Sequence, residues 1–180
     1  MVKNYMIPRR NKQLLQGLLN FIQYINLITS TKDLTICEIG SWCGSSANLF
    51  AQHFKTVVCI DPFKQDKEIT TRFNMKEVEA EFDKVKAKYS NIVKIKHYSY
   101  DAVKIFDNKC FDIVYIDGEH SYKAVKQDIK LYLPKCKGFI SGHDYWQKKF
   151  PGVVKAVNEC LGKPDKIFKD SSWIKIINKE

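Results

Sequence analysis

The sequence predicts an α/β fold in which a doubly wound, mostly parallel sheet of seven strands lies between two layers of helices. Two observations predict it. Short apolar runs alternate along the chain with stretches in which apolar residues recur at helical spacing. The first apolar run stops at a glycine turn that leads directly into a helix, which is typical of α/β domains. No internal repeat or low-complexity tract interrupts this alternation.

Each expected element has its own signal. Strands are expected over residues 35–39, 57–60, 92–95, 111–116, 138–141, 166–169 and 173–177. Helices are expected over about 11–28, 45–54, 74–89, 99–106, 121–133 and 152–161. Asn74 followed by Glu77 forms a capping-box pattern at one helix start, and Ser121 caps the next long helix. Residues 62–73 lack any period and predict a loop near the ligand-binding edge of the sheet.

Length and composition predict one folded domain over residues 1–180, with residues 1–30 as an N-terminal helical addition that packs on the sheet. The chain is 44% hydrophobic, which is ordinary for a globular protein. Its six cysteines form no CxxC pair, and this favours reduced thiols over a disulfide frame or a zinc site. No signal-like apolar core and no run of about 18 apolar residues occur. The sequence therefore predicts a cytoplasmic protein without a membrane partner.

The net charge of +10 comes almost entirely from lysine, because arginine occurs only at Arg9, Arg10 and Arg72. Base reading in nucleic acids depends strongly on arginine, so the charge favours a solvated surface over nucleic-acid binding. Steering of an anionic substrate or partner is the alternative. The densest basic patch also includes Lys3 and Lys12.

The stretch 35–46 indicates a nucleoside ligand. Glu38 precedes the turn at Gly40, where the carboxyl end of a strand opens onto a crevice, and a carboxylate there needs a polar partner. Asp61 ends the second strand, 23 residues after Glu38, at a position suited to accept hydrogen bonds from two ribose hydroxyls.

Further polar groups follow the later strands, and the carboxyl ends of parallel strands meet at one edge of a sheet. Asp117 ends the fourth strand, while His143 and Asp144 end the fifth, so these groups can form a seat for a divalent cation. His120 lies one helical turn after Asp117, and a neutral imidazole there can accept a proton at cellular pH. A dinucleotide site is disfavoured because Trp42 stands where G-x-G-x-x-G has its second glycine.

The glycine turn resembles the first motif of class I S-adenosylmethionine-dependent methyltransferases, in the run CEIGSWCGSSANLF, and it is most similar to the catechol O-methyltransferase-like branch. A second region resembles small-molecule and sugar O-methyltransferases, in the runs YIDGEHSYKAVKQDI and GFISGHDYW. Together the two regions span about residues 34–146. The resemblance implies the Rossmann-like methyltransferase fold, a three-layer α/β/α sandwich.

The resemblance also implies site residues. Matched by position, the cofactor would be bound by Glu38, Gly40, Ser41, Gly44, Ser46, Asp61, Ser99, Tyr100 and Asp117. A divalent metal, Mg or Mn, would bind Asp117, His143 and Asp144, and the catalytic residues would be His120 as the base and Asp117. His143 stands where the family usually has a carboxylate, which either shifts the preference toward a transition metal or removes a ligand.

The predicted function is methyl transfer from S-adenosylmethionine to a hydroxyl of a small molecule or sugar, assisted by a divalent metal. Two alternatives stay open: an RNA or protein acceptor, and a non-catalytic module that only binds the cofactor. Tyr145 and Trp146 could stack on a flat acceptor or a sugar face. The short cover over the site suggests an open site, a homodimer that completes it or a large acceptor.

Overall fold

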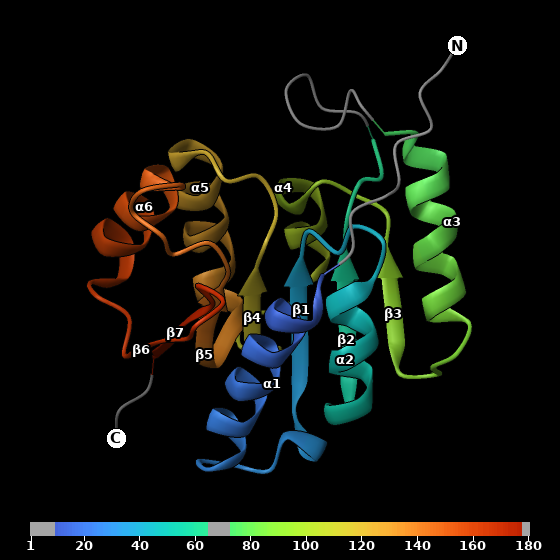
Figure 1. The fold of residues 1–180 in the computed structure, drawn as a ribbon, viewed down its shortest axis with the longest axis horizontal. Helices are drawn as coiled ribbons and strands as arrows, with labels where there is room; N and C mark the ends of the chain where they lie inside the picture. The colour runs from blue at the N-terminus through green and yellow to red at the C-terminus, as the bar shows by residue number, and fades with distance from the viewer. Residues whose placement is uncertain (1–9, 65–72, 178–180) are drawn as a thin grey trace.

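The computed structural model describes residues 10–64 and 73–177. Within these residues, seven strands form one sheet in the order β3-β2-β1-β4-β5-β7-β6 (Figure 1). The neighbours from β3 to β5 pair in parallel, and β7 pairs antiparallel with both β5 and β6. The strands are β1 (Thr35–Ile39), β2 (Thr56–Ile60), β3 (Ile92–Ile95), β4 (Phe111–Ile116), β5 (Cys136–Gly142), β6 (Lys166–Ile167) and β7 (Trp173–Ile176). The predicted doubly wound, mostly parallel sheet is confirmed.

Helices cover both faces of this sheet. They are α1 (Lys12–Asn26), α2 (Ser45–His53), α3 (Met75–Lys86), α4 (Ser99–Ala102), α5 (Tyr122–Tyr132) and α6 (Pro151–Leu161). One core cluster joins α1, α2 and α3 to one face of the sheet, and a second joins α4, α5 and α6 to the other. Figure 1 shows α1 and α2 in front of the sheet. Along β4, Ile113 and Tyr115 belong to the first cluster and Val114 and Ile116 to the second, as the alternation of a strand requires.

The predicted helix starts are present. The Asn74 side chain accepts from the Lys76 N–H at 3.1 Å, and its amide donates to Glu77 at 3.1 Å, so the capping pair forms through side chains. The Ser121 hydroxyl accepts from the Ala124 N–H at 3.3 Å. Asn11 caps α1 in the same way. These caps fix where α1, α3 and α5 begin.

Several element ends differ from the prediction. Helix α3 ends at Lys86, so Tyr89 packs against the core from beyond the helix. Strand β5 begins two residues earlier than expected, at Cys136. Strand β6 has two exposed residues instead of four, because it is an edge strand that pairs, within the described residues, with β7 alone.

Helix α1 packs on the sheet, as expected for the N-terminal addition, through Leu18, Phe21, Ile22 and Ile25. Lys3 and Arg9 of the basic patch, and residues 65–72 of the predicted crevice loop, lie outside the described residues. In the described ranges, the helices are all too short or too polar to cross a bilayer. The prediction of a single domain over residues 1–180 stays a prediction.

Strand order reverses between β1 and β4, because β1 connects onward to β2 on one side while β4 continues to β5 on the other. In doubly wound sheets the crevice at such a switch point, beyond the carboxyl ends of the strands, is the usual place for a ligand. The glycine turn after β1 and Asp117 after β4 lie at this point.

Candidate active site

A cavity of about 970 Å³ opens at the carboxyl ends of the strands. This volume is at the upper end for sites that bind small ligands. The predicted site residues that line it are Gly40, Ser41, Ser46, Asp61, Ser99, Tyr100, Asp117, His120, His143 and Asp144. Two predicted cofactor residues, Glu38 and Gly44, do not line it. The groups expected from five different strand ends therefore meet in one space.

The turn after β1 requires glycine at Gly40. Its φ is +86°, and a Cβ there would lie 2.4 Å from the backbone oxygen of Asp117. The absence of a side chain lets the ends of β1 and β4 approach and leaves backbone exposed to the cavity. Gly44 also has positive φ, +80°, but a Cβ there would lie 3.2 Å from Phe82 and Val85 of the α3 region. Gly44 thus supports helix packing.

Glu38 is fully buried beneath the turn. Its carboxylate accepts a hydrogen bond from the Ser46 hydroxyl at the start of α2 and lies 3.7 Å from the Cys59 sulfur. Burial raises the pKa of Glu38 to about 7, although the Ser46 hydrogen bond acts in the opposite direction. Glu38 therefore fastens α2 to β1, and Ser46 is the member of this pair that reaches the cavity.

Asp61 lines the cavity at the end of β2. Its two oxygens accept from the backbone N–H groups of Trp42, at 2.9 Å, and Phe63, at 2.7 Å. Both residues have φ of +47°, so Asp61 stabilises two strained turns. Burial raises its pKa, and the backbone N–H groups act against this shift. A carboxylate offers about four lone-pair sites, so Asp61 can still accept from a ribose hydroxyl.

Asp128 is a site residue that the sequence prediction missed. It lines the cavity, is 5% exposed, and accepts from the Ser99 hydroxyl at 2.5 Å. Burial raises its pKa to about 6. The sequence contained a signal for Asp128, because it shares the buried face of α5 with Val125, Ile129 and Tyr132. An acid in such an apolar stripe is rarely buried unless it has a polar partner.

Two carboxylates and two imidazoles cluster beside the ends of β4 and β5. His120 Nε2 lies 2.8 Å from Asp144 Oδ2 and 3.7 Å from Asp117 Oδ1. His143 Nδ1 lies 3.1 Å from Asp144 Oδ1 and 3.9 Å from Asp117 Oδ1. All four side chains are at most 29% exposed, so their charges interact in a poorly solvated space.

The cluster shifts the pKa values of His120 and Asp144. Burial alone would lower the pKa of His120, but Asp117 and Asp144 outweigh it and raise this pKa to about 9. Burial would raise the pKa of Asp144, but His120 and His143 hold it well below its usual value. Without a bound cation, His120 is therefore an imidazolium at neutral pH.

The backbone after β5 places these side chains. Asp144 has φ of +60°, a left-handed conformation that is uncommon for a residue other than glycine. The His143 N–H donates to the Ile116 oxygen at 3.0 Å, and the Trp173 indole donates to the His143 oxygen at 3.3 Å. The strain at Asp144 is thus maintained by β4 and β7 on either side.

Asp170 is a second missed residue, with a side chain that is fully buried. One of its oxygens lies 3.8 Å from His143 Nε2, and both accept from Ser172, at 3.1 Å from the N–H and 2.8 Å from the hydroxyl. It packs against Gly17, where a Cβ would lie 2.2 Å from Asp170 Cγ. No sequence pattern indicated this contact between α1 and the loop before β7.

Arg10 is the third missed residue, since the sequence prediction placed it only in a basic patch. Its guanidinium donates to Asp117 Oδ2 inside the cavity, with 10% of the Arg10 side chain and 15% of the Asp117 side chain exposed. Asp117 therefore has a cationic partner on one oxygen and faces His120 and His143 on the other.

The donor set fits a divalent metal. One donor atom each from Asp117, His120 and Asp144 lies within 4.8 Å of the others. Among the described residues, Nε2 of His120 and Nε2 of His143 are buried without a hydrogen-bond partner of good geometry. Mixed carboxylate and imidazole ligands favour a transition metal such as Mn²⁺ over Mg²⁺. The donor atoms thus group His120 with the two acids, whereas the sequence prediction had His143 as the third metal ligand. If His120 bound the metal, it would not be free to act as a base.

Residues 37–145 match a family model described as a methyltransferase domain. The chain belongs to this methyltransferase family. An uncharacterized protein of Acanthamoeba polyphaga mimivirus is 34% identical to it over 144 residues, which are 72% of this chain and 60% of that protein. The chain thus spans 60% of the length of this curated relative.

Solved structures show the same fold. A Klebsiella pneumoniae protein described as a candidate O-methyltransferase has a TM-score of 0.67 at 15% identity, with 96% of this chain and 84% of that chain covered. CalS11, a TDP-rhamnose 3'-O-methyltransferase of calicheamicin biosynthesis, has a TM-score of 0.60 at 13% identity, with 99% and 90% covered. The fold predicted from the methyltransferase resemblance is confirmed.

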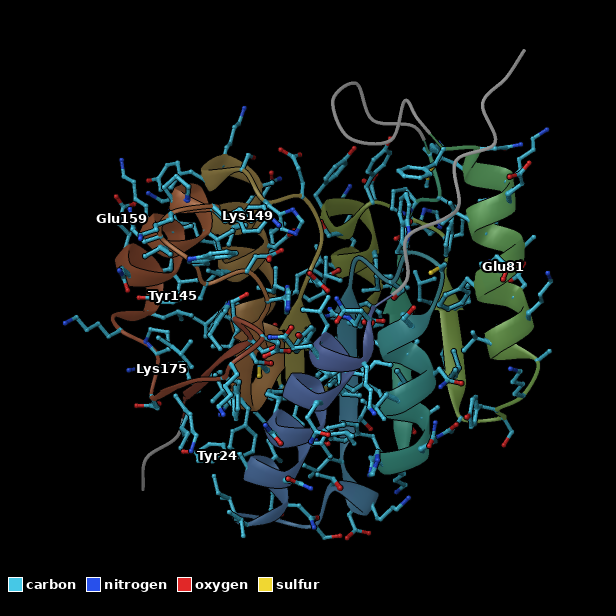
Figure 2. All side chains as sticks on the ribbon, in the orientation of Figure 1. Tyr24, Glu81, Tyr145, Lys149, Glu159 and Lys175 are labelled. Carbon is cyan, nitrogen blue, oxygen red and sulfur yellow. The ribbon has the colours of Figure 1, made fainter. Side chains whose placement is uncertain are left out.

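The methyltransferase cavity has an aromatic wall beside His120. The Phe150 ring lies 4.8 Å from the His120 ring, and Lys149 Nζ lies 4.9 Å from the Phe150 centroid and 6.0 Å from that of Trp146. Tyr145 and Trp146 both line the cavity, but Trp146 is 51% exposed, whereas the Tyr145 hydroxyl donates to Asn158 of α6 at 2.8 Å. Figure 2 shows Tyr145 and Lys149 beside α5 and α6. Trp146 is therefore the better placed of the two predicted stacking residues.

Proposed function

We propose that this protein transfers a methyl group from S-adenosylmethionine to a hydroxyl of a small molecule or sugar, with a divalent cation at the cluster of Asp117 and Asp144. One observation carries the proposal. A single cavity contains both Asp61, the acid suited to a ribose, and His120, the group suited to take a proton. Family membership supports the cofactor, and the aromatic wall supports a flat acceptor or a sugar face.

The cofactor end of the cavity extends from the glycine turn to α4. Gly40 and Ser46 border it at β1 and α2, Asp61 at β2, and Ser99 with Asp128 at α4 and α5. Tyr98 and Tyr100 stack on each other there, with centroids 5.2 Å apart and planes 9° apart. We infer that these groups bind the nucleoside, whose sulfonium would supply a methyl group that a deprotonated hydroxyl can attack.

The acceptor end lies between His120 and Trp146. His120 takes the hydroxyl proton on the ring nitrogen opposite Asp144, whose carboxylate lies 2.8 Å from Nε2, orients the ring and stabilises the imidazolium that results. For this step His120 must first be neutral. A divalent cation on Asp117, His143 and Asp144 would supply the positive charge that lowers the pKa of His120 and of a nearby hydroxyl.

A methylation assay tests the proposal. Purified protein is incubated with S-adenosylmethionine and panels of nucleotide sugars, glycans and hydroxylated aromatic compounds, with Mn²⁺, with Mg²⁺ or with EDTA. The proposal predicts a product that gains one methyl group on oxygen, with lower yield in EDTA. Methylation only of RNA or of protein side chains would contradict it, and so would S-adenosylhomocysteine binding without turnover on any acceptor class.

A further inference from the structure

The ion pair between Arg10 and Asp117 has no role in the proposed function, although Asp117 also faces His120 and His143 of the proposed metal site. The guanidinium donates to Asp117 Oδ2, and both side chains are largely buried in the wall of the cavity. Burial lowers the pKa of Arg10, but Asp117 and the neighbouring acids Glu38 and Asp170 outweigh it and raise this pKa above its usual value. Arg10 is therefore a permanent cation at this point.

The backbone of Arg10 is fixed by α1. Asn11 caps the helix by accepting from the Leu14 N–H, and the helix is buried against the sheet through Leu18, Phe21 and Ile25. Arg10 precedes this cap directly, so its Cα is held at the rim of the cavity. The three-carbon stem of the side chain still rotates, and the guanidinium can leave Asp117 without unfolding any element.

Like Asp144, the same carboxylate belongs to both metal-ligand sets, the geometric set with His120 and the predicted set with His143. A carboxylate has enough lone pairs for an arginine and a metal together, but the two cations then stand only a few ångströms apart. A guanidinium and a divalent cation at this separation repel each other, and the poorly solvated wall of the cavity screens that repulsion only weakly. This repulsion exceeds what an ordinary outer hydrogen bond to a metal ligand contributes.

We propose that Arg10 is a resident counter-ion of Asp117 that competes with the divalent cation, so that metal binds only when the Arg10 side chain withdraws. The start of α1 then controls access to the metal site. The inference rests on the cation of the proposed function, but it concerns a residue that the methyltransferase resemblance does not assign.

Manganese titration tests the competition directly. Free Mn²⁺ is measured by electron paramagnetic resonance for wild-type protein and for Arg10→Gln, without cofactor or acceptor. The proposal predicts that the variant binds Mn²⁺ at least about tenfold more tightly. Arg10→Lys, which keeps the charge but loses the planar fork, should bind with an affinity between the two.

A matched control separates local competition from general electrostatics. Lys149→Gln also removes one positive charge from the lining of the cavity, but no ion pair joins Lys149 to Asp117 within the described residues. Its Mn²⁺ affinity should stay within about threefold of wild type. Equal gains in both variants, or weaker binding in Arg10→Gln, would overturn the proposal and make Arg10 a supporting neighbour of the metal ligands.

The folding of each variant is checked by its melting temperature and by S-adenosylhomocysteine binding. If Arg10→Gln folds and binds no Mn²⁺, the inference is overturned, because removal of the arginine should expose the site. If the variant still bound the cofactor and transferred methyl groups in that case, the proposed reaction would be supported, but without a metal. If wild-type protein did not bind S-adenosylhomocysteine, that result would instead contradict the proposed function.

Discussion

At the residue scale, the chemistry of the site depends on charges that share two carboxylates. Asp117 and Asp144 face His120 and His143, and Arg10 takes the remaining oxygen of Asp117. In this arrangement His120 holds a proton at neutral pH, because its pKa is raised to about 9. Any base chemistry therefore requires a further cation or a rise in pH.

Replacement of His120 tests its role as the base. His120→Gln keeps a polar side chain of similar length but cannot take a proton. We expect methyl transfer to fall by about 10²–10⁴-fold while S-adenosylhomocysteine binds within about twofold of wild type. His97→Gln, on an exposed histidine outside the cavity, is the matched control and should keep full activity. Equal activity of the two variants would exclude His120 as the base.

The same histidine gives stability a pH dependence. Because the folded-state pKa of His120 is raised from 6.5 to about 9, its contribution is fully present below pH 6.5 and is lost as pH rises through 9. In EDTA, the free energy of unfolding from urea titrations should fall between pH 6.5 and 9. His120→Gln should flatten this fall. An equally steep fall in the variant would mean that other groups cause it.

Removal of the ionisable group at Glu38 should stabilise the folded protein at high pH. Its folded-state pKa of about 7 exceeds the usual 4.5, so wild-type stability decreases as pH rises from 4.5 to 7. Glu38→Gln keeps an acceptor for the Ser46 hydroxyl and cannot ionise. We expect it to be about 1–3 kcal/mol more stable than wild type at pH 8 and similar at pH 5. A variant that is less stable at pH 8 would show that the carboxylate charge stabilises the fold.

At the scale of elements, apolar patterning predicted most of the fold. Strands β1, β2 and β4 are mostly apolar, and a buried parallel strand leaves few alternatives. The turn at Gly40 was predictable because its backbone requires glycine. The ends of β6 and α3 were not, since exposed edge residues and residues just beyond a helix carry the same local pattern as the elements themselves.

Some residues of the candidate site could likewise be predicted from the sequence, and others could not. Groups at strand ends, such as Asp61 and Asp144, were predictable because parallel strands place their carboxyl ends together. Asp128 was visible as an acid in an apolar stripe of α5. Arg10 and Asp170 were not, because each reaches the site only through how α1 and the loop before β7 pack in three dimensions.

Helix α1 contacts the loop before β7 where Gly17 packs against Asp170, and a substitution can test this contact. In an open helix, Gly→Ala stabilises by about 1 kcal/mol, but a Cβ on Gly17 would lie 2.2 Å from Asp170 Cγ. Gly17→Ala should therefore destabilise by about 1–3 kcal/mol, as overpacking does. Thermal unfolding measures it, with Gln16→Ala on the exposed side of α1 as the control. A rise in melting temperature for Gly17→Ala would contradict the close packing.

At the scale of the whole molecule, the sheet brings two half-sites to one cavity. In the proposed reaction, residues after β1 and β2 would form the cofactor half, and residues after β4 and β5 form the half with the acids and imidazoles. The two halves adjoin because β1 pairs with β4. The proposed reaction needs this adjacency, since a methyl donor and a hydroxyl must lie within attack distance.

Calorimetric titration of the protein with S-adenosylhomocysteine tests this account most directly. We predict one site per chain with micromolar affinity, weakened at least about tenfold by Asp61→Ala and left within about twofold by His120→Gln. Absence of saturable binding to the wild-type protein, or binding that Asp61→Ala leaves unchanged, would contradict the account.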